Sequence, residues 1–103
     1  SNPEYVEIKN NSCVEVDISG WAVVSHGQPP PCYVGVPSQF FIFPPGSILA
    51  VGQTARVYSG SNANPSVPYF WTTAFRWDNS GDIADLINAQ GLLVGSFATG
   101  NCV

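Results

Sequence analysis

The sequence predicts an all-β fold, in which short antiparallel strands form the two layers of a sandwich. Apolar and polar residues alternate with a period of two in several short stretches, as they do in half-buried strands. The 103 residues include 10 glycines and 9 prolines but no methionine, and turn-forming residues separate the alternating stretches. Together these observations indicate about seven to nine short strands in a single domain that spans residues 1–103.

The stretch 14–24 is expected to organise this fold, after a first strand at residues 5–10. Val16 and Ile18 alternate with acidic residues, and the apolar phase continues at Trp21 after a shift of one residue. Such a shift is typical of a β-bulge, and Gly20 provides the backbone freedom that a bulge often needs. We therefore expect Trp21 to point into the core.

The remaining strands are separated by segments rich in proline, glycine, serine and asparagine. Strands are predicted at residues 39–43, 55–58, 83–87 and 92–97, with loops at residues 25–37 and 59–68 and an apolar connection at residues 47–51. The residues from Asn88 to Gly91 fit the turn of a hairpin, with Gly91 in the left-handed conformation. The inner face of this hairpin is expected to carry Ala84, Leu86, Leu93 and Phe97.

The charge balance limits the classes of partner. Lys9, Arg56 and Arg76 are the only basic residues against seven acidic ones, and the formal net charge is −4. Proteins that bind nucleic acid neutralise phosphates with many lysines and arginines, so the composition argues against that class and favours protein, cationic or neutral partners. No apolar run approaches the roughly 20 residues of a membrane-spanning helix, so we expect no membrane insertion.

The residues do not form a recognisable catalytic or metal-binding pattern. His26 is the only histidine, which excludes a histidine-based metal cluster within the chain. Asp78, Ser80 and Asp82 have the spacing of calcium-loop ligands, but Ile83 occupies the position of the required glycine and no glutamate follows. The carboxylates fall mostly on outward strand positions or in turns, so we expect no enzyme activity, no metal and no cofactor.

Residues 69–77 contain five aromatic side chains. Tyr69 and Phe70 follow a proline-rich loop and are the two that we expect to be exposed. There they could offer a stacking surface to a protein partner or to a carbohydrate.

Three cysteines allow one disulfide bond with one thiol left over, or three free thiols. If the first and last strands lie side by side in parallel, as they commonly do in immunoglobulin-like sandwiches, Cys13 and Cys102 lie just past the same end. Cys32 would lie near the opposite end. A bond between Cys13 and Cys102 is therefore the candidate pairing, and three unpaired thiols are the alternative.

The order and spacing of these motifs resemble the lamin tail domain family, an immunoglobulin-like module found at the end of nuclear lamins and in many bacterial proteins. The resemblance covers nearly the whole chain. It rests on residues 5–10, Ser19-Gly20-Trp21, Phe43-Pro44-Pro45 with Leu49 and Gly52-Gln53, Trp71 and Trp77, residues 79–82, and the hairpin with Gly91, Leu93 and Val94. We expect the core to contain Trp21, Phe43, Trp71, Trp77, Leu86 and Leu93.

The resemblance implies a non-catalytic β-sandwich used for binding or scaffolding. Animal lamin tails contact chromatin, DNA and inner-membrane proteins, whereas bacterial members look like accessory modules of secreted or surface proteins. Because basic residues are scarce here, we expect an interaction or scaffolding module, excised from a larger protein that is secreted or at the cell surface. The alternative is a scaffold tail of the nuclear lamina.

Overall fold

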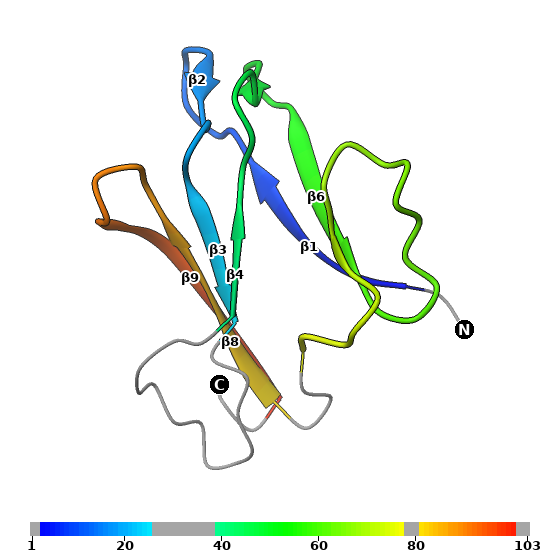
Figure 1. Cartoon of the computed structure of the whole chain (residues 1–103). Helices are drawn as coiled ribbons and strands as arrows, with labels where there is room; N and C mark the ends of the chain where they lie inside the picture. The colour runs from blue at the N-terminus through cyan, green and yellow to red at the C-terminus, as the bar shows by residue number, and fades with distance from the viewer. Residues whose placement is uncertain (1–2, 26–38, 78–80, 101–103) are drawn as a thin grey trace. The chain divides into compact units, whose positions relative to one another are not determined.

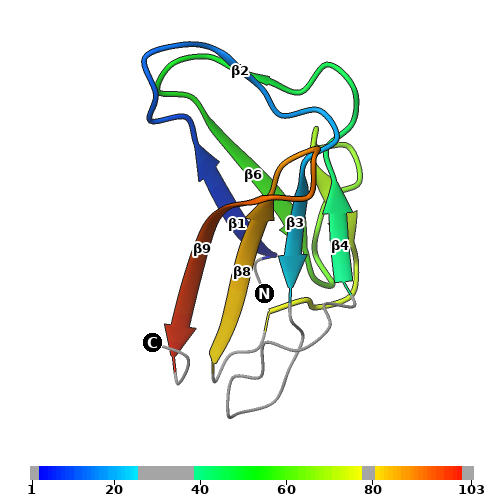
Figure 2. The ribbon, with the colours of Figure 1, turned by 90° about the vertical axis from the view of Figure 1, so that its left-hand side faces the viewer.

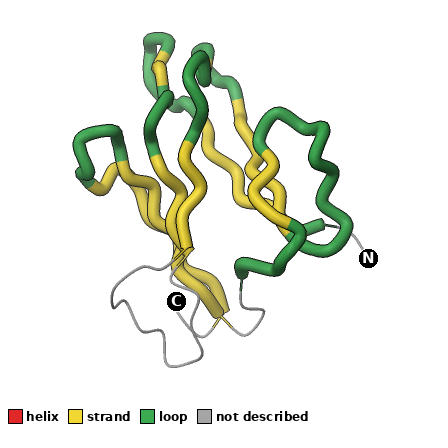
Figure 3. The backbone as a smooth tube through the Cα atoms, viewed as in Figure 1, coloured by secondary structure: helices red, strands yellow, loops and turns green. Residues whose placement is uncertain are grey.

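The computed structural model describes residues 3–25, 39–77 and 81–100, and the regular structure in these residues consists of strands (Figure 3). The nine strands in this part of the chain are β1 (Glu4–Lys9), β2 (Val16–Asp17), β3 (Ala22–Ser25), β4 (Gln39–Ile42), β5 (Ile48–Leu49), β6 (Thr54–Ser59), β7 (Phe70–Thr72), β8 (Gly81–Ile87) and β9 (Leu93–Gly100). The predicted all-β class is confirmed. The described residues form no helix long and apolar enough to cross a membrane.

The strands fall into two units, each made of two separate segments of the chain. Unit 1 comprises residues 1–20 and 43–75, and unit 2 comprises residues 21–42 and 76–103. Unit 1 contains a three-stranded sheet in the order β1-β6-β7 and the two-stranded pair β2-β5, whereas unit 2 contains a four-stranded sheet in the order β4-β3-β8-β9.

In unit 1, β1 runs antiparallel to β6 (Figure 1). On the other side of β6, β7 runs parallel to it. The register places Val6 opposite Val57 and Ile8 opposite Ala55. Val57 and Ala55 are buried, while Arg56 is exposed on the other face of the strand. The period-two alternation therefore predicted the buried face of these two strands correctly.

The turn after β1 is organised by the buried side chain of Asn10. Its Nδ2 donates hydrogen bonds to the carbonyl oxygens of Val14 at 2.9 Å and Leu49 at 3.0 Å. Its Oδ1 accepts from the backbone nitrogen of Ser12 at 2.9 Å and from the Ser12 hydroxyl at 2.6 Å. One amide group thus connects the β1–β2 turn to β5.

The stretch around Gly20 forms a turn between two strands, and the prediction of a bulge at this position was wrong. Asp17 Oδ1 accepts hydrogen bonds from the backbone nitrogen of Ser19 at 2.9 Å and from its hydroxyl at 2.6 Å, and Gly20 has a φ of 80°. β2 pairs with β5, whereas β3 belongs to the four-stranded sheet. A tight turn and a bulge shift the apolar phase in the same way, so the pattern alone did not separate them.

In unit 2, β3 lies between β4 and β8, and β9 forms one edge of the sheet (Figure 2). All four residues of β3 are buried. The β8–β9 hairpin turns as predicted: Gly91 has a φ of 81°, and its nitrogen donates to the carbonyl oxygen of Asn88 at 2.9 Å. The nitrogen of Asn88 in turn donates to the carbonyl oxygen of Leu92 at 2.9 Å.

The register of this hairpin shifts between Leu86 and Ile87. Ala84 pairs with Phe97, whereas Leu93 pairs with Ile87 beyond the shift. Because successive residues of a strand point to opposite faces, Leu93 shares a face with Ile87 and not with Leu86. The side chain of Leu93 is 63% exposed, so its predicted place in the core was wrong.

The other predicted core residues are buried to different degrees. Phe43 is 1% exposed and is among the largest fully buried side chains. Trp21, Trp71, Trp77 and Leu86 are partly buried. Trp21 is thus not the fully enclosed centre that was expected. The buried apolar residues are Ile18, Phe43, Leu49, Ala55, Val57 and Ala63 in unit 1, and Ala22, Val23 and Val24 in unit 2.

Candidate binding surface

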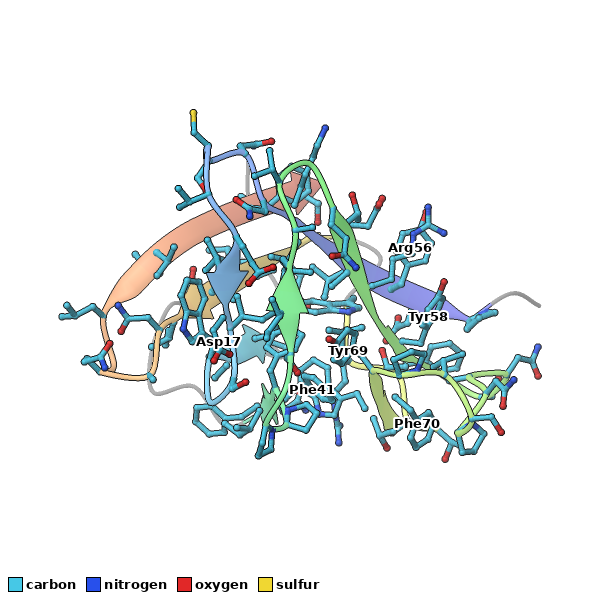
Figure 4. All side chains as sticks on the ribbon, turned by 90° about the horizontal axis from the view of Figure 1, so that it is seen from above. Asp17, Phe41, Arg56, Tyr58, Tyr69 and Phe70 are labelled. Atoms are coloured by element: carbon cyan, nitrogen blue, oxygen red, sulfur yellow. The ribbon has the colours of Figure 1, made fainter. Side chains whose placement is uncertain are left out.

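The outward face of β1 and β6 in unit 1 brings together aromatic and charged side chains. The antiparallel register places Tyr5 opposite Tyr58 and Glu7 opposite Arg56. We name the surface formed by Tyr5, Glu7, Arg56 and Tyr58 the Tyr5–Arg56 face. Figure 4 labels Arg56 and Tyr58 on β6.

The Tyr5–Arg56 face is held together by contacts between rings and a cation. The guanidinium carbon of Arg56 lies 4.4 Å from the centroid of the Tyr5 ring, which is the geometry of a cation–π interaction. The rings of Tyr5 and Tyr58 have centroids 5.7 Å apart and are tilted by 54°. Tyr5 therefore contacts both Arg56 and Tyr58 of β6.

An ion pair fixes the guanidinium from a second side. Arg56 Nε lies 3.4 Å from Glu7 Oε2, and both side chains remain exposed to solvent. A side-chain hydrogen bond with Tyr58 raises the pKa of Arg56, and charge interactions with Tyr5 and Glu7 raise it further. An exposed ion pair contributes little to stability, so its main effect here is to orient the cation over the ring.

Tyr69 and Phe70 are the aromatic pair that we expected to be exposed. They lie beside Tyr58 of this face, and both are partly buried. The Tyr69 ring packs edge-on against Phe43, with centroids 5.1 Å apart and an interplanar angle of 78°. Its carbonyl oxygen accepts a hydrogen bond from the nitrogen of Tyr58 at 2.9 Å, and Phe70 pairs with Tyr58 across β6 and β7. The packing on Phe43 gives Tyr69 a structural role, and partner binding by the pair stays a prediction.

Sequence reasoning did not identify Tyr5, Arg56 and Tyr58 as a group. The alternation indicated that each residue points away from the buried face of its own strand. Their meeting depends on the β1–β6 register, which joins segments far apart in the chain. Two outward tyrosines on predicted strands were the available signal, since a solvated strand face has no need of large rings.

The weak calcium pattern is only partly covered by the described residues. Asp82 is buried, and its Oδ1 accepts a hydrogen bond from the nitrogen of Ile83 at 2.8 Å. Asp78 and Ser80 lie outside the described residues, as does His26. Within residues 3–25, 39–77 and 81–100, no three His, Cys, Asp or Glu side chains are grouped so that they could hold a metal ion.

The predicted disulfide bond assumes that the first and last strands lie side by side in parallel, and the strand pairing in the sheets does not show this arrangement. Within the described part of the chain, β1 pairs with β6 and β9 pairs with β8, so the first and last strands are not hydrogen-bonded neighbours. Cys13 is exposed. Cys32 and Cys102 lie outside the described residues, and the Cys13–Cys102 pairing stays a prediction.

Comparison with known protein families is decisive for the assignment. The model of the Lamin Tail Domain family matches residues 1–101, which is nearly the whole chain. The chain belongs to the lamin tail domain family. A search of curated proteins found no match. The predicted resemblance is confirmed, and lamin tail domains are immunoglobulin-like modules without enzymatic activity that generally take part in protein interactions.

Proposed function

We propose that this lamin tail domain is a non-catalytic protein-interaction module and that the Tyr5–Arg56 face is its binding surface. The observation that carries the proposal is the guanidinium of Arg56, which is stacked on Tyr5 and held by Glu7 while remaining exposed. Tyrosine and arginine are enriched among the residues that contribute most to protein–protein binding. Side chains that are already ordered lose less entropy when a partner binds.

The chemistry of this face fits a carbonyl or carboxylate group of a protein partner. A guanidinium has five N–H donors, and the contacts of Arg56 with Glu7 and Tyr58 use only part of them. The remaining donors can bind a carboxylate or a backbone carbonyl. The rings of Tyr5 and Tyr58 beside them supply apolar contact area.

The same geometry favours a protein over a carbohydrate or nucleic acid. Stacking of a sugar ring needs an open aromatic face, and Arg56 covers one face of Tyr5 at 4.4 Å. Nucleic acid needs several cations, whereas the single cation of the Tyr5–Arg56 face is paired with Glu7 and the chain has a net charge of −4.

Panning a phage-displayed random peptide library on the immobilised chain tests this assignment. Enriched peptides are then titrated against the parent chain, Tyr5→Ala and Arg56→Ala by calorimetry. We expect each variant to lose about tenfold or more in affinity, as hot-spot residues do. The control is Phe40→Ala, which removes an exposed aromatic side chain from β4 in unit 2. Peptides that bind both variants as tightly as the parent chain would contradict the assignment.

We also propose that the module works in a secreted or cell-surface protein. The scarcity of basic residues supports this setting, because a nuclear tail that binds chromatin needs cations for DNA. The full-length gene tests the proposal. A signal peptide together with an anchor or hydrolase domain supports it, and a long heptad-repeat rod with a nuclear import signal contradicts it.

A further inference from the structure

The strand β9 is an open edge of the unit 2 sheet. It pairs with β8 on one side, and among the described residues no strand pairs with its other side (Figure 2). An edge strand presents a row of N–H and C=O groups that can accept a further strand. Long edges are therefore usually protected by charges, prolines or short length.

The other edges of the three- and four-stranded sheets carry such protection. β1 contains Glu4, Glu7 and Lys9 among its six residues. β7 has only three residues, and β4 has four, with Pro44 and Pro45 one residue beyond its end. β9 has eight residues, Leu93–Gly100, with neither a charge nor a proline. Among these four edges, only β9 lacks a device against pairing.

Large apolar side chains are exposed along the same strand. Leu93 is 63% exposed and Phe97 is 68% exposed, and Leu92 and Val94 are exposed as well. Leu93 shares a face with Ile87, whereas Phe97 shares a face with Ala84, so both faces of β9 present apolar surface. The Ser96 hydroxyl of β9 donates a hydrogen bond to Asp85 Oδ1 at 2.7 Å, within the sheet.

We propose that β9 pairs antiparallel with β9 of a second copy of this chain, which joins the two four-stranded sheets into one. Antiparallel pairing of a strand with itself has two-fold symmetry, so it closes as a dimer and does not continue into a fibre. A charged partner strand would find no opposite charge on β9. The complementary strand is uncharged and apolar, and β9 itself has that composition.

The net charge of the chain does not oppose this arrangement locally. Two copies with a charge of −4 each repel one another, but the paired strands bring no like charges opposite one another. The repulsion between the remaining charges is screened by salt. Dimerisation is therefore expected to strengthen as the salt concentration rises.

Sedimentation velocity of the 103-residue chain between about 1 µM and about 1 mM tests the proposal. We expect a reversible monomer–dimer equilibrium that Phe97→Lys weakens by about tenfold or more, because pairing then places a charged lysine of each copy beside the apolar partner strand. The matched control is Ile42→Lys, which adds the same charge at a 57% exposed residue on β4, the opposite edge of the sheet. It is expected to leave the dimer constant within about twofold.

Hydrogen exchange on the unmodified chain gives an independent readout. Amides of residues 93–100 are expected to become more protected as protein concentration rises, while those of β4 stay unchanged. A chain that remains monomeric over this range overturns the proposal, as does a dimer that Phe97→Lys leaves intact. Circular dichroism tests whether Phe97→Lys is folded. If this variant is unfolded, the concentration dependence of hydrogen exchange in the unmodified chain tests the proposal by itself.

Discussion

Arg56 stacks on Tyr5, with 4.4 Å between the guanidinium carbon and the ring centroid, as a diagonal neighbour across two antiparallel strands. The residue directly opposite Arg56 is Glu7, and the residue directly opposite Tyr5 is Tyr58. Diagonal neighbours lie within reach of long and aromatic side chains. The contact therefore depends on the register, because a slip of one residue would send one of the two side chains to the other face.

The first prediction concerns this diagonal contact. Tyr5→Leu is expected to remove the ring-current shift from the Hδ and Hε protons of Arg56, which resonate upfield when the ring lies beneath them. Two-dimensional NMR measures these shifts directly. Lys9→Ala, a change at another outward position of β1, serves as the control and is expected to leave them in place. Unchanged Arg56 resonances in Tyr5→Leu would show that the stack is absent in solution.

The second prediction concerns the buried amide of Asn10. Asn10→Ala leaves the carbonyl oxygens of Val14 and Leu49 without their donor, and we expect it to lower the free energy of unfolding by about 2–3 kcal/mol. Asn10→Asp is expected to cost more at neutral pH, because a carboxylate oxygen would face those carbonyls. Urea denaturation measures both variants. The exposed neighbour Asn11→Ala is the control, with an expected change within about 0.5 kcal/mol.

The third prediction concerns the core of unit 1. Phe43 is buried and supports the Tyr69 ring, so Phe43→Ala is expected to cost about 3–5 kcal/mol. This is a large part of the stability of an ordinary domain, so the variant is expected to be partly unfolded at 37 °C. Phe40→Ala makes the same chemical change at an exposed position and is expected to cost about 1 kcal/mol or less. Equal urea midpoints for the two variants would refute the burial of Phe43.

The fourth prediction concerns the Asp17–Ser19 turn. Hydrogen bonds from the Ser19 hydroxyl and backbone nitrogen lower the pKa of Asp17 below its ordinary value of 3.8. Because the folded pKa is the lower one, the stabilisation is present above the ordinary value and is lost as the pH falls through the folded pKa. Ser19→Ala removes the hydroxyl donor, so the pKa of Asp17 is expected to rise.

Carboxyl-detected NMR titration of Asp17 between about pH 6 and about pH 2 provides the measurement. Ser66→Ala, at an exposed residue elsewhere in unit 1, is the control and is expected to leave the Asp17 midpoint unchanged. An Asp17 midpoint that Ser19→Ala does not raise would contradict the turn geometry.

Local patterns predicted the fold where the physical cause is local. The alternation of Val6 and Ile8 identified the buried face of β1, and the sequence from Asn88 to Gly91 identified the hairpin turn, since a glycine is needed at a φ of 81°. At Gly20 the pattern failed, because the hydrogen bonds from Ser19 to Asp17 that close the turn are not visible in an apolar periodicity.

Features that depend on pairing between distant strands were not predictable in the same way. Leu93 was assigned to the core because its spacing from Phe97 suits an uninterrupted strand, and the register shift beside Leu86 changed its face. The Tyr5–Arg56 face was missed for a related reason, since the outward tyrosines form one group only through the β1–β6 register.

The division of each unit into two chain segments bears on how the protein is synthesised. β1 leaves the ribosome before its hydrogen-bonding partner β6, which begins at Thr54, and before β7, which follows at Phe70. The nascent β1 segment therefore stays unpaired until β6 has been translated. During this delay, Val6 and Ile8 are exposed to chaperones and to neighbouring nascent chains. A fragment that ends after residue 20, the end of the first segment of unit 1, is therefore expected to be unstable.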